Sequence, residues 1–215
     1  MTNSIEEFSK ELFDCHNSTV DSNVPFGDLN LKKHFLFCEQ YNGLSSLAKF
    51  VALTNKEFDE IKIYTDCTVK TPWQHLKHIY KDKITVEHLD EIPEINKNNK
   101  KKTLFIVDAV YYTATPRVLE YLCMGRPLNY TCCFFSKLFS NCPSIIKNLV
   151  RYIVITSHMP RIYQLFKRHG VKDSDVKKAI NNAIKDGGMA LIDTETDDVN
   201  RMIRSNYADD FYHLK

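Results

Sequence analysis

One acidic residue stands where a long apolar run of the sequence ends. Residues 103–107 are five apolar or β-branched residues, and Asp108 follows them directly. Such a run is typical of a strand that is buried on both faces of a parallel sheet. Ligands bind such sheets at the carboxyl ends of the strands, where Asp108 would lie. Its carboxylate could hold Mg²⁺ through water beside a nucleotide phosphate, or it could be an ordinary turn residue.

A second stretch has the spacing of a phosphate-binding loop. The pattern G-x-x-x-x-G-K-[ST] can be placed on the eight residues that begin at Cys38. Gly43 and Ser45 match the second glycine and the hydroxyl residue of the pattern. Cys38 stands in place of the first glycine, and Leu44 stands in place of the lysine. The match is therefore a degenerate one.

The two replacements change the chemistry that this loop could perform. Leu44 supplies no positive charge to a phosphate, and Glu39 adds a negative charge to the same loop. Backbone N–H groups and the dipole of the following helix would remain as anion donors. Ser45 could still ligate Mg²⁺. A phosphate site built from these groups alone would be weak.

The elements that would position these residues alternate along the chain. Strands are expected at residues 34–38, 61–64, 83–86, 103–108, 129–135, 151–155 and 189–193, and helices at residues 44–54, 72–80, 115–124, 143–148, 159–169 and 173–185. This alternation predicts an α/β fold with a mostly parallel central sheet and helices on both faces. Residues 1–30 form a polar lead-in, residues 31–215 form a single domain, and residues 199–214 within it form a polar tail.

The composition is that of an ordinary globular protein. The 215 residues are 43% hydrophobic and 26% charged, and the net charge is +2, which forces neither a nucleic-acid nor a membrane partner. No apolar run approaches the about 20 residues that span a bilayer. The seven cysteines are irregularly spaced, which favours reduced, mostly buried thiols and an intracellular site over a disulfide framework.

Several stretches, in order and at sensible spacing, together resemble the poxvirus-type viral DNA-packaging ATPases of the FtsK/HerA superfamily of P-loop NTPases. The stretches are residues 34–46, 58–64, 104–109, 125–130, 135–136, 143–148, 190–193 and 204–207. Together they cover the chain from about residue 31 to about residue 211, which exceeds what one short motif could indicate. The resemblance implies a P-loop NTPase-like fold with ATP and Mg²⁺ as cofactors.

The resemblance also implies roles for individual residues. Gly43, Ser45 and Ser46 fall on the nucleotide-phosphate loop, together with the altered positions Cys38 and Leu44. Asp108 falls on the magnesium acid, and Ser45 would be the second magnesium ligand. Arg126 falls on a family arginine that could stabilise charge at the γ-phosphate, or it is a surface arginine after a helix. Ser136 falls on a sensor-like position.

The departures from the family pattern predict that ATP hydrolysis is lost or strongly reduced. Leu44 replaces the lysine, Ala109 stands where a second acid is usual, and Ser136 replaces a glutamine. Charge clamps of this kind contribute about 10³–10⁵-fold to phosphoryl-transfer rates. The chain therefore resembles a pseudoenzyme or a non-catalytic subunit that keeps the fold of an ATPase and loses its chemistry.

Two other functions are compatible with the sequence. The first is an active ATP-driven motor that translocates viral DNA into capsids. The second is a nucleic-acid or protein binding module that uses no nucleotide and presents the lysines Lys97, Lys100, Lys101, Lys102, Lys172, Lys177, Lys178 and Lys185. The family resemblance implies a homo-oligomeric ring, double-stranded DNA and capsid proteins as partners, without a membrane. It places the chain in the host cytoplasm or nucleus, or in the virion.

Overall fold

The computed structural model describes residues 29–39, 45–69, 71–108, 115–159, 161–185 and 188–205, without the side chains of Ser45 and Thr71. The strands are β1 (Phe35–Cys38), β2 (Glu60–Thr65), β3 (Ile84–His88), β4 (Thr103–Asp108), β5 (Tyr130–Ser136), β6 (Tyr152–Ile155), β7 (Ala190–Asp193) and β8 (Ile203–Ser205). The α-helices are α2 (Ser45–Thr54), α3 (Thr71–Ile79), α4 (Pro116–Met124), α5 (Ser144–Leu149) and α6 (Asp173–Ala183).

These strands form one eight-stranded sheet in the order β3-β2-β4-β5-β1-β6-β7-β8. The six strands from β3 to β6 in that order pair in parallel. β7 and β8 are added in antiparallel orientation. The predicted α/β fold with a mostly parallel sheet is therefore confirmed.

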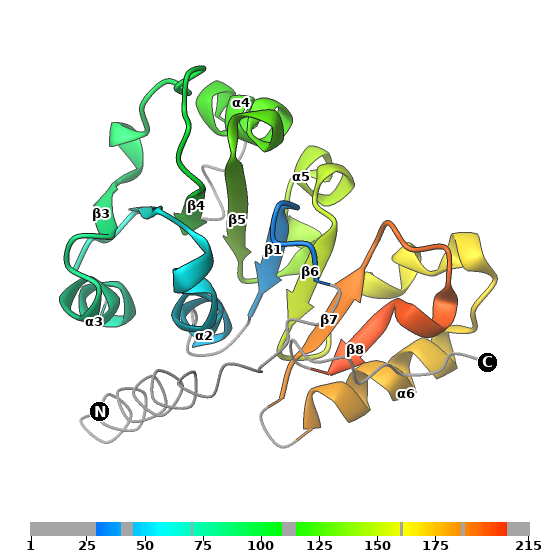
Figure 1. Cartoon of the computed structure of the whole chain (residues 1–215). Coiled ribbons are helices and arrows are strands. Elements are labelled where there is room, and N and C mark those ends of the chain that lie inside the picture. The colour runs from blue at the N-terminus through cyan, green and yellow to red at the C-terminus, as the bar shows by residue number, and fades with distance from the viewer. Residues whose placement is uncertain are drawn as a thin grey trace.

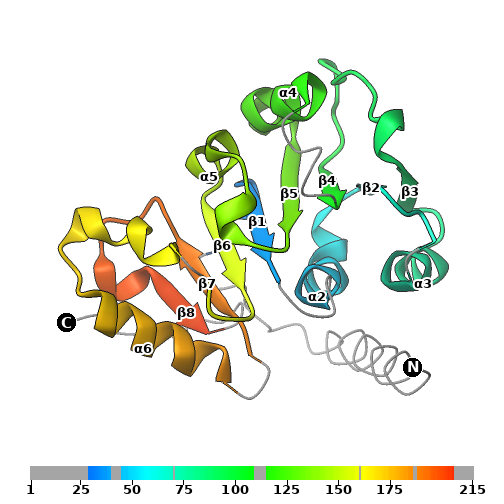
Figure 2. The ribbon, with the colours of Figure 1, turned by 180° about the vertical axis from the view of Figure 1, so that it is seen from behind.

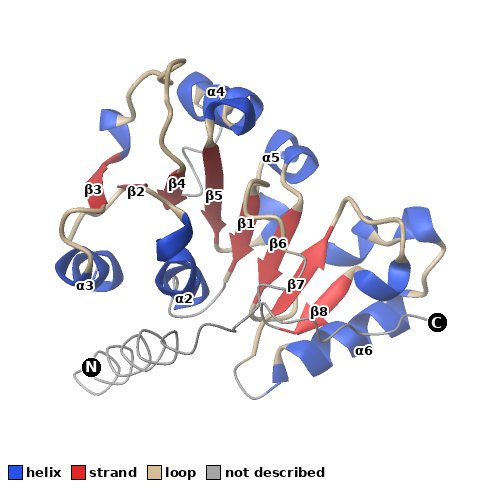
Figure 3. Cartoon of the chain, in the orientation of Figure 1, coloured by secondary structure: helices blue, strands red, loops and turns tan. Residues whose placement is uncertain are grey.

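Helices cover both faces of the sheet, as Figure 1 and the view from behind in Figure 2 show. α2 and α3 lie on one face, and α4 and α5 lie on the other (Figure 3). Successive residues of β1 alternate between the two layers. Phe35 and Phe37 belong to the core cluster that includes α2 and α3, and Leu36 and Cys38 belong to the cluster that includes α4, α5 and α6. All four are buried, as the continuous apolar run predicts for a strand covered on both faces.

The connections between strands determine where a ligand can bind. β1 and β2 are followed by helices on one face, and β4 and β5 are followed by helices on the other face. At the ends of the neighbouring strands β1 and β5, the two following connections therefore leave toward opposite faces of the sheet. The same is true of the neighbours β2 and β4. We call this end of the sheet the carboxyl edge, and the end where the parallel strands begin the amino edge. Such divergence points are the usual ligand sites of open α/β sheets.

The helix predicted over residues 159–169 is not formed. The described residues of this stretch make two short 3₁₀ segments, Ile162–Leu165 and Lys167–His169. Arg161 has a positive φ of 70°, and this left-handed conformation cannot continue into a right-handed α-helix. Gly170, also at positive φ, ends the stretch as predicted.

The stretch expected to be a polar tail contributes to the sheet. After the 3₁₀ turn Val199–Arg201, β8 pairs antiparallel with β7. Residues 206–215 lie outside the described part of the chain, as does the predicted lead-in up to residue 28. Within the described ranges, no helix combines the length and the apolar character needed to cross a bilayer.

Candidate functional site at the carboxyl edge of the sheet

Asp108 lies at the carboxyl edge, as predicted, at the last position of β4. The residue is only 2% exposed. Its carboxylate oxygen Oδ2 accepts a hydrogen bond from the indole Nε1–H of Trp73 at 2.6 Å. The same oxygen accepts a second hydrogen bond from the Thr65 hydroxyl at 3.0 Å. Asp108 is therefore a buried acceptor for the neighbouring strand and for helix α3.

The strand register brings these three residues together. Thr65 ends β2 directly beside Asp108, which ends β4. α3 follows β2, and its first turn carries the fully buried Trp73 over this strand end. Neither partner was identified from the sequence. Two signals were present, because Thr65 is a polar residue at a strand end and Trp73 is the single tryptophan of the chain.

These contacts engage one of the two oxygens that a magnesium acid would offer to the ion. In that role the carboxylate accepts hydrogen bonds from water held by the ion. In this chain Oδ2 of Asp108 accepts one protein N–H group and one protein O–H group. Among the described residues, no group of three or more His, Cys, Asp or Glu side chains is placed to hold a metal ion. Through Oδ2, Asp108 acts as a structural acceptor that links β2 and α3 to the end of β4.

Replacing Asp108 with alanine is expected to lower the free energy of unfolding by about 2 kcal/mol, because the buried indole N–H of Trp73 would lose its acceptor. Urea unfolding followed by far-ultraviolet circular dichroism measures this loss. Asp90→Ala is the control, since the Asp90 side chain is 78% exposed, and its effect should stay within about 0.5 kcal/mol. Equal, small effects in both variants would contradict the structural role of Asp108.

The described residues on either side of the degenerate loop lie at the same edge, where Glu39 is beside the end of β5. Cys38 is buried at the end of β1, and burial raises the pKa of its thiol well above the ordinary value, so that it stays protonated. Ser46, in the first turn of α2, donates its hydroxyl hydrogen bond to Glu39. Gly43, Leu44 and Ala109, with the side chain of Ser45, lie outside the described part of the chain.

Ser136, the predicted sensor-like residue, ends β5 at the carboxyl edge. It is 1% exposed, and its hydroxyl donates a hydrogen bond to the carbonyl of Leu138 at 2.7 Å. Its own carbonyl accepts the backbone N–H of Glu39 at 3.1 Å. Ser136 therefore joins the backbone at Glu39 to the backbone at Leu138.

Arg126 lies at the opposite edge of the sheet. α4 returns the chain to the amino edge because β4 and β5 are parallel, and Arg126 follows α4. Its Nη2 donates to the carbonyl of Leu149 at 2.8 Å and lies 3.8 Å from a carboxylate oxygen of Glu195. The length of β4, about 16 Å at about 3.3 Å per residue, separates this position from Asp108. The structure therefore does not place Arg126 at a phosphate held beside Asp108 in the same chain.

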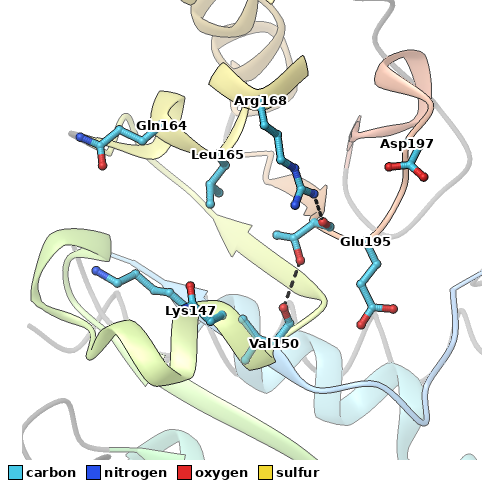
Figure 4. Close-up of a pocket in the computed structure, with 9 residues that line it drawn as sticks. Lys147, Val150, Gln164, Leu165, Arg168, Glu195 and Asp197 are labelled. Atoms are coloured by element: carbon cyan, nitrogen blue, oxygen red, sulfur yellow. Dashed lines mark hydrogen bonds between the residues drawn. The ribbon is translucent and has the colours of Figure 1, made fainter. Parts of the chain in front are cut away.

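The amino edge has an ion network and a cavity that the sequence did not indicate. Arg151 binds Asp193 through a fork of hydrogen bonds, and Lys33 pairs with Glu195 at 2.8 Å. A cavity of about 740 Å³ beside this network is lined by Lys147, Arg168, Glu195 and Asp197, among others (Figure 4). Its walls carry charges of both signs. Arg168 already donates to the carbonyl of Thr194, which lies beside it.

The lysines that could serve a binding module are all exposed. They lie on two separate elements, which are the loop before β4 and the region of α6. Lys101 is paired with Glu60 at 3.3 Å. The lysines therefore form two groups and not one continuous stripe.

Comparison with known proteins gives a match in structure but not in sequence. No protein-family model and no curated protein matches the chain. The genome-packaging NTPase B204 from Sulfolobus turreted icosahedral virus 2, in complex with AMPPCP, superposes with a TM-score of 0.56 at 13% identity, over 82% of this chain and 97% of that chain. Its complex with ATP-gammaS gives a TM-score of 0.53 at 12% identity, with the same coverage of both chains.

The DNA-packaging ATPase B204 from Sulfolobus turreted icosahedral virus gives a TM-score of 0.51 at 14% identity, again over 82% of this chain and 97% of that chain. At such low identity the likeness concerns the fold and not the chemistry. The mostly parallel sheet, with its helices on both faces, is thus an architecture that this chain shares with a viral genome-packaging NTPase.

Proposed function

We propose that this chain is a viral DNA-packaging ATPase-like protein in which ATP hydrolysis is lost or strongly reduced. The observation that carries this proposal is the engagement of Asp108, whose Oδ2 accepts hydrogen bonds from Trp73 and Thr65. An acid that binds Mg²⁺ for phosphoryl transfer offers its oxygens to the hydration shell of the ion, and here one of the two, Oδ2, already accepts two protein donors. Asp108, which the family resemblance assigns to the position of that acid, also stabilises the packing of α3 on the sheet.

The sequence of the neighbouring positions supports the same proposal. Leu44 cannot provide the charge of the P-loop lysine, and Ala109 cannot orient a water molecule. The fold of the chain, in contrast, is retained. A subunit of this kind could contribute shape and contacts to a packaging assembly without turning over nucleotide.

The proposed partners follow from the packaging-type fold. They are other copies of the chain in a ring, double-stranded DNA and capsid proteins, within an infected cell or a virion. The similar NTPase B204 was solved in complex with AMPPCP and in complex with ATP-gammaS. We therefore include ATP as a proposed ligand of this chain, with weak binding, because the loop lacks its lysine.

Hydrolysis of ATP by the purified protein, with and without double-stranded DNA, tests the proposal. We expect a turnover at least about 10³-fold below about 1 s⁻¹, equal to that of Asp108→Ala and unchanged by DNA. The double variant Leu44→Lys, Ala109→Asp is the matched comparison, because it restores two groups that the loop and the strand end lack. Its own turnover shows how much these two groups contribute.

Two results would favour the other functions. DNA-stimulated hydrolysis by the unmodified protein that Asp108→Ala abolishes would contradict the proposal and support an active motor. DNA binding that needs no nucleotide and weakens steeply with salt would support a binding module. A DNA affinity that does not change with salt would exclude contacts to the phosphate backbone.

A further inference from the structure

A second cavity lies at the amino edge, over the starts of four neighbouring strands. It encloses about 340 Å³, a volume within the range of small-molecule sites. Its walls come from the segments that precede β1, β2, β4 and β5, and from the first residues of β5. These four strands are adjacent in the sheet, in the order β2-β4-β5-β1. The cavity is therefore built from segments that are far apart in the sequence.

Apolar side chains form much of the lining of this cavity. They belong to Leu29, Leu31, Phe58 and Tyr130. Phe58 is 5% exposed and Tyr130 is 3% exposed, so both rings are anchored in the core. A ligand that fills this space therefore needs an apolar body, for which two aromatic rings are suitable neighbours.

Hydrogen bonds hold the walls of the cavity in place. The backbone N–H of Asn30 donates to the hydroxyl of Tyr152 at 3.0 Å, and the hydroxyl of Thr131 donates to the carbonyl of Leu31 at 2.5 Å. The segment before β4 exchanges two hydrogen bonds with the segment before β2. The cavity is therefore formed before a ligand arrives, and binding would require little ordering of the chain.

Positive charge predominates around the cavity. Of the described residues that line it, three are cations, Lys32, Lys102 and Arg126. Glu57 is the one acid in the same set. In the described part of the chain, neither lysine side chain lies within ion-pair distance of a carboxylate. Arg126 faces Glu195 at 3.8 Å, but that carboxylate pairs more closely with another cation, at 2.8 Å. The charge around the cavity therefore favours an anion.

We propose that this cavity binds a small organic anion with an apolar body, of the class of the aromatic carboxylates. The apolar body lies against Phe58 and Tyr130. The anionic group lies at the outer rim, toward the exposed residues Lys32 and Lys102. The inference goes beyond the proposed function and does not depend on it, because the cavity is at the amino edge and the candidate nucleotide position is at the carboxyl edge.

The test is the affinity of the purified protein for naphthoate, measured by isothermal titration calorimetry at low ionic strength. Two further probes separate the parts of the ligand, since naphthamide lacks the charge and acetate lacks the apolar body. We expect naphthoate to bind at least about tenfold more tightly than either of them. Naphthoate that binds no more tightly than acetate or naphthamide overturns the inference.

Two exposed residues that line the cavity give opposite expectations for the same probe. Lys102→Gln removes a cation, so naphthoate should bind about fivefold more weakly, and Glu57→Gln removes the acid, so it should bind about fivefold more tightly. Lys178→Gln is the matched control, since Lys178 is exposed on α6, which contributes no residue to the described lining. Circular dichroism confirms that each variant is folded. Equal affinities in all three variants also overturn the inference, because the probe would then bind outside this cavity.

Discussion

Replacing Arg151 with alanine is expected to lower the free energy of unfolding by about 4 kcal/mol. The Asp193 side chain is 4% exposed, and it accepts hydrogen bonds from Arg151 Nε at 3.0 Å and from Arg151 Nη2 at 2.7 Å. Removing the guanidinium leaves this carboxylate buried without its cation, and that desolvated charge accounts for most of the loss. Urea unfolding measures the change, and the thermal midpoint should fall by about 10 °C.

Two further variants separate the charge from the packing. Arg151→Lys keeps the positive charge but loses the planar fork, so an intermediate loss is expected. In the double variant Arg151→Ala, Asp193→Ala the loss should be smaller than the sum of the two single losses, because no unpaired charge remains. A loss below about 1 kcal/mol in Arg151→Ala would show that the pair behaves as an exposed surface salt bridge.

Acidification from pH 7 to pH 4 is expected to lower the stability by about 3 kcal/mol through His34 alone. His34 is fully buried, its Nδ1 accepts the backbone N–H of Cys132, and its Nε2 contacts the carbonyl of Leu122 at 3.0 Å. Burial, with a contribution from the nearby Arg126, lowers the pKa of His34 from 6.5 to about 4. The neutral ring donates through Nε2 and accepts through Nδ1, and protonation would remove that acceptor.

The sign of the effect follows from proton uptake. Between pH 6.5 and pH 4 the unfolded chain binds a proton at residue 34 that the folded chain does not, so stability falls as the pH falls. The loss should reach about 2 kcal/mol by pH 5, where most carboxylates are still ionised. Urea unfolding at a series of pH values measures it, and a neutral variant, His34→Gln, is the control. Equal slopes for both proteins between pH 7 and pH 5 would contradict a neutral buried His34.

The central features of the fold could be predicted from local sequence. The apolar runs of β1 and β4 are continuous because both faces of these strands are covered, and this pattern was sufficient to locate them. β8 could not be found in the same way. It has three residues, with Arg204 between Ile203 and Ser205, and it exists because β7 offers an unpaired edge. The local periodicity of a sequence does not show which segments pair as strands.

In the candidate site, too, some features could be predicted from local sequence and others could not. The position of Asp108 follows from one strand and one rule about strand ends, so the sequence was sufficient to place it at the carboxyl edge. Its hydrogen-bond partners depend on which strand pairs with β4 and on which face of the sheet α3 covers. Neither follows from local sequence. Arg126 was grouped with Asp108 by family order. Because β4 and β5 are parallel, α4 runs back along the sheet, and Arg126 therefore lies at the amino edge.

The contact between Trp73 and Asp108 has a practical consequence for the study of this protein. Trp73 is the only tryptophan of the chain, it is fully buried, and its indole N–H points at the carboxylate of the candidate site. Indole emission depends on the polarity and hydrogen bonding around the ring. The protein therefore carries an intrinsic fluorophore at the position of interest, and ligand titrations can be followed optically without a label.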